Sequence, residues 1–234
     1  MKSTKDIHFA FRQTIPVMLG YIFLGTAFGL MLNDAGYHFL WAFLISTVVY
    51  AGSMQFVMVV LLSGGAGLLY TAMMTLFING RHIFYGLSLV EKFKKMGKSY
   101  PYMIFSLTDE TYSVLCRTKI PSDRNENKVM LYISLLNHSY WVLGSVIGGL
   151  AGQWIGFNTT GIEFSMTALF TAIVVEQWQE KSNRLSIFIG GFSAIFFLLV
   201  LGPDRFIMPT LMLSVFVILL MKKYRMPGEE ERND

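Results

Sequence analysis

Long apolar segments separated by short polar breaks occupy most of the chain. The pattern predicts such segments at residues 13–32, 39–63, 66–90, 129–151, 161–179, 185–201 and 206–221. A helix needs about 20 mainly apolar residues to cross a bilayer. The stretch 101–116 is too short and too polar to predict a crossing. The sequence therefore predicts an all-α, polytopic membrane helix bundle with about seven or eight hydrophobic segments.

Polar residues interrupt the third segment, 66–90. Asn79, Gly80, Arg81 and His82 stand together inside it. A charge at membrane depth is expensive and usually faces a bundle interior or a polar cavity. The alternative places Arg81 and His82 near an interface, where they extend toward the headgroups. Their distance from the end of the segment favours a polar site.

The second segment, 39–63, carries no charge but contains Gly52, Ser53 and Gln55. A glutamine amide in hydrocarbon needs hydrogen-bond partners. We therefore expect Gln55 to face protein or a cavity.

Charge orientation bears on both segments. The lysine-rich stretch 91–98 is expected in the cytoplasm, as is the basic lead 1–12. Two simple spans at 39–63 and 66–90 would return the chain to the outer side. One or more segments are therefore predicted to be broken or re-entrant, at Gly52-Ser53 or at Asn79-Gly80, where the backbone would line protein or a cavity. An eight-span bundle that violates the charge bias once is the alternative.

Acidic residues supply the remaining candidate chemistry. Ser106 to Asp109 matches a capping box, which would place Asp109 at a helix N-terminus. Together with Glu110, Asp109 could instead form a cation or proton site. Glu163 and Thr167 are four residues apart and share a helix face. Glu176 would lie about 20 Å further along the same helix, near the other interface, so Glu163 is the stronger functional candidate of the two.

Glycines at a spacing of four predict close helix packing. Gly25 and Gly29 form one such pair, and Gly144, Gly148 and Gly152 form a longer stripe. Small residues at this spacing let helix backbones approach one another in membranes.

Composition agrees with a membrane protein. Hydrophobic residues make up 53% of the 234 residues and charged residues 15%, against about 25% charged in soluble domains. The net charge of +4 comes from basic residues at membrane flanks, which indicates orientation rather than nucleic-acid binding. The single Cys116 excludes an internal disulfide and a cysteine-based metal site. No metal or cofactor is expected, and residues 1–234 are predicted to form one transport domain with a charged tail at 222–234.

Several blocks in order resemble the AzlC family, the large subunits of bacterial branched-chain amino acid exporters. They are 16–29, 50–56, the positions Asn79, Arg81, His82 and Tyr85, then 107–110 and 161–170. The resemblance covers roughly residues 9–220. The family more often has Asp where this chain has Glu163, which lengthens the carboxylate side chain by one methylene.

The resemblance implies a secondary exporter in the bacterial inner membrane that moves leucine, isoleucine, valine and, as a further candidate, methionine. It also implies a small AzlD-like membrane subunit as partner. The chain has no Walker motif, so a proton gradient or an energising partner would drive transport.

A zwitterionic substrate suggests roles for the polar residues. Arg81, or a broken-helix N-terminus near Gly52 and Ser53, would receive the substrate carboxylate. Glu163 would accept the ammonium group or carry the coupling proton. The remaining candidates are His82 as a proton relay, Gln55 and Asn79 as neutral hydrogen-bonding groups, and Asp109 and Thr167 as further site residues.

Two other classes stay open. A membrane enzyme could use Glu163, Asp109 and His82 for acid–base chemistry, although no Ser-His-Asp order, HExxH or paired metal-ligand motif is present. An assembly subunit would have no substrate path. Replacing Arg81 and Glu163 by apolar residues would distinguish an assembly subunit from a transporter, because a scaffold should tolerate the change better than a transporter.

Overall fold

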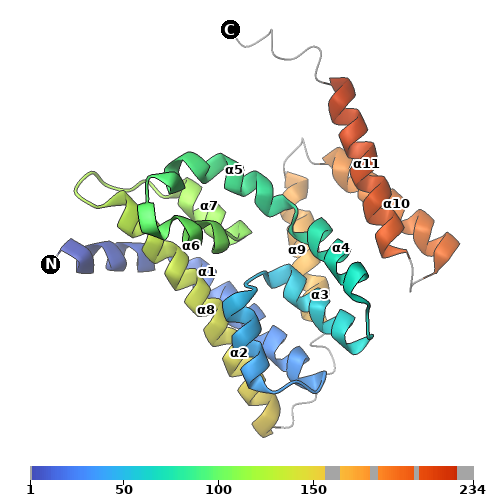
Figure 1. Ribbon diagram of the computed structural model, residues 1–234, viewed down its shortest axis with the longest axis horizontal. Helices are drawn as coiled ribbons and strands as arrows, with labels where there is room; N and C mark the ends of the chain where they lie inside the picture. The colour runs from blue at the N-terminus through green and yellow to red at the C-terminus, as the bar shows by residue number, and fades with distance from the viewer. Residues whose placement is uncertain (1, 156–163, 180–183, 203–205, 226–234) are drawn as a thin grey trace. The chain divides into compact units, whose positions relative to one another are not determined.

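Helices joined by short turns make up the computed structural model, which describes residues 2–155, 164–179, 184–202 and 206–225 (Figure 1). Within these residues helix is the only regular secondary structure, which confirms the prediction of an all-α chain there. The chain divides into two compact units, unit 1 (residues 1–167) and unit 2 (residues 168–234). The two units are separated by the contacts within the chain alone. Whether residues 1–234 act as one transport domain is not tested by this division and stays a prediction.

In chain order the helices of unit 1 are α1 (Lys2–Asp34), α2 (Phe39–Val48), α3 (Gly52–Ser63), α4 (Leu68–Asn79), α5 (Arg81–Lys94), the 3₁₀ helix η1 (Gly97–Ser99), α6 (Tyr100–Phe105), α7 (Asp109–Arg117) and α8 (Glu126–Ile155). Helix α9 (Phe164–Gln179) crosses the boundary, and α10 (Arg184–Leu201) and α11 (Ile207–Arg225) belong to unit 2.

Two of the described helices are long and apolar enough to cross a membrane, residues 5–34 of α1 and the whole of α10. Shorter apolar helices cover 39–48, 52–63, 68–79 and 209–218. These elements agree with a helical membrane bundle, while the number of crossings stays a prediction.

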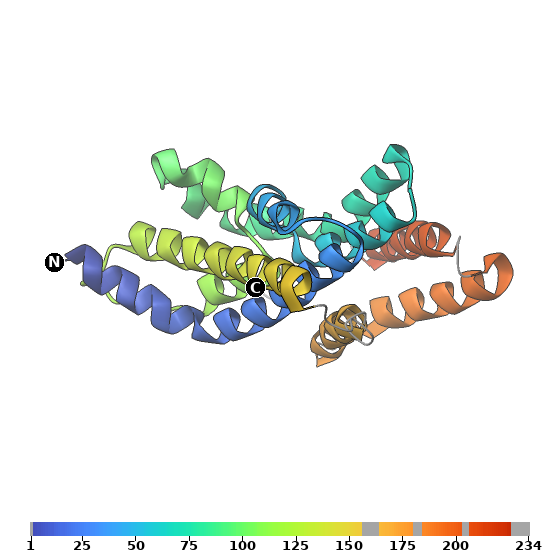
Figure 2. The same ribbon diagram turned by 90° about the horizontal axis from the view of Figure 1, so that it is seen from below.

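The helices α1 and α8 lie side by side (Figure 2). Their backbones meet at glycines: a Cβ atom built at Gly25 would lie 2.9 Å from the carbonyl oxygen of Trp141. One built at Gly29 would overlap the carbonyl oxygen of Ser145, and one at Gly148 would overlap the backbone of α1. Any side chain at these positions would push the helices apart, so the predicted glycine packing face is confirmed.

The first helix begins earlier than the apolar pattern indicates. The pattern places its start at Gln13, whereas α1 runs without interruption from Lys2. Asp6 and Ala10 are buried, so tertiary packing supports these early turns. Pro16 therefore does not stand in the first turn of this helix. It lies in the helix interior, where it cannot donate the usual bond to the carbonyl four residues earlier.

The second and third apolar segments are both interrupted. Segment 39–63 divides into α2 and α3 at residues 49–51, and segment 66–90 divides into α4 and α5 at Gly80. At the first break Tyr50 has a φ of 43°, in the left-handed region that bulky side chains rarely adopt. The prediction of a broken segment is confirmed, and both breaks lie beside the polar positions that suggested it.

A third break separates α6 from α7. The N-cap of α7 is Thr108, whose Oγ1 accepts a hydrogen bond from the Thr111 amide at 3.2 Å. Ser106 Oγ instead donates to the carbonyl of Tyr102 in α6, at 2.8 Å. The predicted capping box that starts at Ser106 is therefore wrong by two residues, because that serine bonds back to the preceding helix. The prediction that Asp109 stands at a helix N-terminus is confirmed.

Two apolar clusters hold unit 1 together around these breaks. Four aromatic rings from α1, α3 and α8 pack between the long helices, with centroids 5.3 to 6.5 Å apart: Tyr21, Phe28, Phe56 and Trp141. A second cluster gathers buried side chains from the start of α1, the end of α5, α6, α7 and the start of α8. Its largest fully buried members are Phe93, Met103 and Ile133.

Unit 2 packs α10 on α11. Thr210 Oγ1 of α11 donates to the carbonyl oxygen of Ser193 in α10 at 3.4 Å. The Trp178 and Phe188 rings lie 5.4 Å apart, which joins α9 to α10. Helix α11 continues to Arg225, so the start of the predicted charged tail is helical, and residues 226–234 lie outside the described residues.

Candidate functional site

The side chain of Gln55 joins three helices at the break between α2 and α3. It is fully buried, and its Oε1 accepts hydrogen bonds from the Ala51 amide (3.2 Å) and from Trp141 Nε1 (2.9 Å). Its Nε2 donates to Ser46 Oγ (3.1 Å), which donates to Ser145 Oγ (2.8 Å). The expectation that Gln55 faces protein or a cavity is confirmed. Its contacts tie the first turn of α3 to α2 and α8.

A second chain of hydrogen bonds runs from α7 to α1 and α8. Tyr21 Oη donates to Glu110 Oε2 (2.7 Å) and lies 2.6 Å from Thr108 Oγ1. Thr111 Oγ1 lies 3.0 Å from Thr108 Oγ1 and accepts a bond from Asn137 Nδ2, also at 3.0 Å. Glu110 is half-buried and its four neighbours are buried. The first turn of α7 therefore presents a carboxylate and two hydroxyls to the long helices.

The aromatic ring of Tyr50 connects the two chains of hydrogen bonds. It packs on the ring of His138 with centroids 4.2 Å apart, and its hydroxyl lies near the side chains of Tyr21 and Thr111. His138 also lies 3.1 Å from Tyr102 Oη and 3.3 Å from a backbone carbonyl of α2. Breaks in two helices and the middle of α8 thus meet at one polar region.

Two buried oxygens in this region have no hydrogen-bond partner among the described residues, Tyr50 Oη and Asn137 Oδ1. The two side chains are 4% and 0% exposed. Buried polar atoms in folded proteins almost always have a partner, either protein, water or ligand. Two unsatisfied acceptors in the same network as the Glu110 carboxylate can receive a group that donates hydrogen bonds.

The structure brings two predicted site residues together. His82 Nε2, in the first turn of α5, lies 3.8 Å from Asp109 Oδ1 at the start of α7. The Tyr85 ring stacks on the Tyr112 ring at 4.7 Å and holds the same two helices together. The pair is charged on both sides only when His82 is protonated. Asp109 therefore lies within ion-pair distance of a histidine, at the end of α7 that also carries Glu110.

The other predicted residues lie at two of the helix breaks. Gly52 and Ser53 are the first two residues of α3, and Ser53 is buried. Asn79 is the last residue of α4, and Arg81 is the first residue of α5. Helix N-termini at both breaks present backbone N–H groups, which favour anions.

The last two predicted residues belong to the region after α8. Thr167 is exposed on α9. Glu163 lies outside the described residues, so its shared face with Thr167 stays a prediction.

Sequence reasoning missed the chain of hydrogen bonds around Glu110. One signal was present in α8, where polar positions 134, 137, 138, 141 and 145 follow helical spacing on one face. Tyr21 and Tyr50 offered none, since tyrosine is common in membrane segments.

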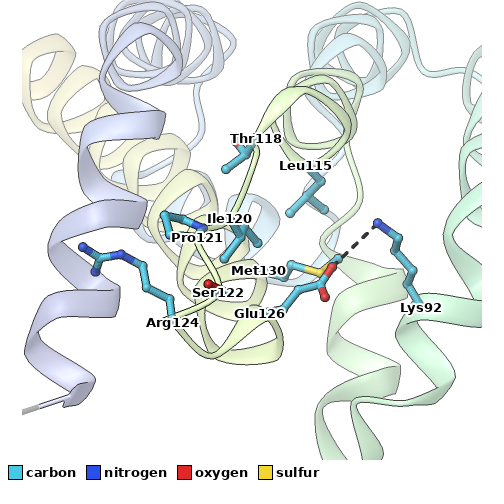
Figure 3. Close-up of a pocket in the computed structure, with 9 residues that line it drawn as sticks. All are labelled: Lys92, Leu115, Thr118, Ile120, Pro121, Ser122, Arg124, Glu126 and Met130. Carbon is cyan, nitrogen blue, oxygen red and sulfur yellow. Dashed lines mark ion pairs between the residues drawn. The ribbon is translucent and has the colours of Figure 1, made fainter.

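A separate pocket of about 200 Å³ lies beside the loop between α7 and α8 (Figure 3). Lys92 and Glu126 form an ion pair at 3.7 Å beside it, and both side chains are largely exposed. Arg124 lies 3.9 Å from Asp6 of α1. The pocket belongs to the charged loop and is distinct from the buried network.

Apolar helices with a buried polar network at their breaks agree with a helical membrane protein. The chain belongs to the AzlC family, described as "AzlC protein", which matches residues 16–155. This confirms the resemblance seen in the sequence.

Several membrane and transport proteins are similar to this chain over most of its length. The branched-chain amino acid transport protein AzlC of Bacillus subtilis is 36% identical over 214 residues, 92% of this chain and 84% of the relative. An uncharacterized membrane protein of Helicobacter pylori strain J99 is 38% identical and covers 95% and 96% of the two chains. The inner membrane protein YgaZ of Escherichia coli is 28% identical and covers 74% and 73%. No solved structure matches the chain.

Proposed function

We propose that this chain is the large subunit of a secondary transporter that exports branched-chain amino acids. Its substrates are leucine, isoleucine and valine, with methionine as a further candidate. The single observation that carries the proposal is the 36% identity, over most of the chain, to a relative named as a branched-chain amino acid transport protein.

The polar network supports the same function. A zwitterion needs charged and polar groups inside an otherwise apolar bundle, and transporters place them at discontinuous helices. Three helix breaks occur in unit 1, and the network contains groups from two of them and from α8. A membrane enzyme finds less support, since the Bacillus subtilis relative is named as a transport protein.

Residue roles in this proposal follow from charge. Arg81 or the α3 N-terminus at Gly52 and Ser53 receives the substrate carboxylate. Glu163 accepts the ammonium group or carries the coupling proton, and His82, paired with Asp109, relays protons. The neutral hydrogen-bonding groups are Gln55, Asn79 and Thr167. Apolar neighbours bind the side chain, since burying a leucine side chain contributes about 1.5–3 kcal/mol.

The proposal also includes the membrane in which the chain works and the energy source for transport. The chain works in the bacterial inner membrane with its N-terminus in the cytoplasm and about seven or eight hydrophobic segments. A proton gradient drives export, and a small AzlD-like membrane subunit is the partner.

The test measures intracellular leucine, isoleucine, valine and methionine after dipeptide loading. Cells that lack their own exporters would express the chain with and without the small subunit. A faster fall of these pools with both chains is expected. Unchanged pools with both chains folded and membrane-inserted would overturn the proposed substrate class, and an equal fall without the small subunit would remove the partner.

A further inference from the structure

We propose that Glu110, Asn137 and Tyr50 form the subsite that binds the α-ammonium group of the transported amino acid. The proposal rests on the proposed function and locates one half of substrate recognition in unit 1. It assigns the binding of the ammonium group to Glu110 instead of Glu163, so the role left for Glu163 is to carry the coupling proton.

The charge comes from Glu110. It is the second residue of α7, where the helix dipole favours an ionised carboxylate. Tyr21 Oη donates to its Oε2 at 2.7 Å, which orients the carboxylate toward the long helices. A carboxylate has about four lone-pair sites and can accept several hydrogen bonds at once. Glu110 can therefore accept a hydrogen bond from a cation while Tyr21 holds it in place.

The shape of the subsite comes from the two unsatisfied oxygens. An ammonium group on a substrate carbon has three N–H donors, as a lysine ammonium has. Asn137 Oδ1 and Tyr50 Oη are buried and have no hydrogen-bond partner among the described residues. With the Glu110 carboxylate they supply three acceptors for three donors. The Asn137 amide nitrogen already donates to Thr111 Oγ1 at 3.0 Å, which fixes the orientation of its oxygen.

The surrounding hydroxyls hold this set in place. Thr108 Oγ1 lies 2.6 Å from Tyr21 Oη and 3.0 Å from Thr111 Oγ1. The Thr111 amide donates to Thr108 at 3.2 Å, so the same threonine caps α7. The Tyr50 ring is held against His138, with centroids 4.2 Å apart. Glu110, Asn137 and Tyr50 are thus each positioned by a contact with a neighbouring side chain.

The test compares substrates that differ only at the amino position. Radiolabelled leucine is bound to the purified full chain with its small subunit, and unlabelled 2-hydroxy-4-methylpentanoate, which has a hydroxyl instead of the ammonium group, competes. In the wild type we expect leucine binding and poor competition by the hydroxy acid. In Glu110→Gln the Kd for leucine should rise about 10- to 100-fold, because a hydrogen bond to a charged group is lost. The difference in affinity between leucine and the hydroxy acid should also become smaller in this variant.

A second variant separates a loss of binding from a loss of folded protein. Tyr50→Phe keeps the ring that packs on His138 and removes only an oxygen without a partner among the described residues. It should leave the unfolding midpoint unchanged and raise the Kd for leucine about 2- to 10-fold. Glu126→Gln, at an exposed carboxylate of the charged loop, is the matched control and should bind as the wild type does.

The possible failures are distinguishable. Wild-type leucine affinity and wild-type discrimination in both folded variants, Glu110→Gln and Tyr50→Phe, would overturn the subsite and leave the proposed function intact. Absence of leucine binding in the wild-type complex would overturn the proposed function, and the subsite with it.

Discussion

Trp141 Nε1 donates a hydrogen bond of 2.9 Å to Gln55 Oε1 and thereby attaches the start of α3 to the middle of α8. The same oxygen accepts the Ala51 amide, which belongs to the break between α2 and α3. A tight left-handed residue, Tyr50, stands next to it. The bond therefore joins the connection at Tyr50 to the pairing of α1 with α8, the most extensive helix contact among the described residues.

The first prediction concerns this bond. Gln55→Leu keeps roughly the same side-chain volume but leaves Trp141 Nε1 and the Ala51 amide without the oxygen that accepts their hydrogen bonds. A buried group left unsatisfied costs about 1–3 kcal/mol. We expect a clearly lower unfolding midpoint in detergent. Gln13→Leu, at an exposed position of α1, is the control; equal midpoints in the two variants would show that the Gln55 contacts do not stabilise the break.

The second prediction concerns helix packing. A methyl group at Gly29 would overlap the backbone of α8, whereas one at Gly20 on the same helix meets nothing within 4 Å. We expect Gly29→Ala to reduce folded protein strongly. Gly20→Ala should be neutral or slightly stabilising, because alanine is favoured over glycine in helices by about 1 kcal/mol. Size-exclusion profiles and unfolding midpoints measure both, and a wild-type profile for Gly29→Ala would contradict the close approach of α1 and α8.

The third prediction concerns the start of α7. Thr108→Ala removes the cap of the Thr111 amide and the contact with Tyr21 Oη. Loss of a threonine N-cap costs about 0.5–2 kcal/mol, so the unfolding midpoint should fall and leucine efflux should slow. Thr108→Ser keeps the oxygen and should retain most of both. If the alanine and serine variants behaved alike, the hydroxyl would have no role at this break.

The fourth prediction concerns Glu163. Glu163→Gln removes the charge proposed to carry the coupling proton and should abolish transport without loss of folded protein. The control is Glu91→Gln, at an exposed glutamate paired with Lys94 at 2.8 Å, which should transport normally. Efflux after dipeptide loading measures both, and wild-type efflux in Glu163→Gln would end its proposed role.

Local sequence pattern determined the helices and where they break. Apolar length predicted the segments, the glycine spacing predicted the face between α1 and α8, and the polar positions at Gly52 and Gly80 predicted the interruptions. These features depend on neighbours within one or two helical turns, which a sequence displays directly. The start of α1 and the cap of α7 were misplaced, because burial of Asp6 and the bond from Ser106 to Tyr102 depend on packing and on local competition between acceptors.

Only the tertiary structure decided which polar residues meet. Glu110 and Tyr21 are 89 positions apart, and Gln55 and Trp141 are 86 apart. Hydrogen bonds form over about 3 Å, so such partners are set by how whole helices cross and rotate rather than by spacing along the chain. The sequence by itself therefore determined a membrane helix bundle with polar interruptions, and the packing of α1, α7 and α8 decided that Glu110 joins the network.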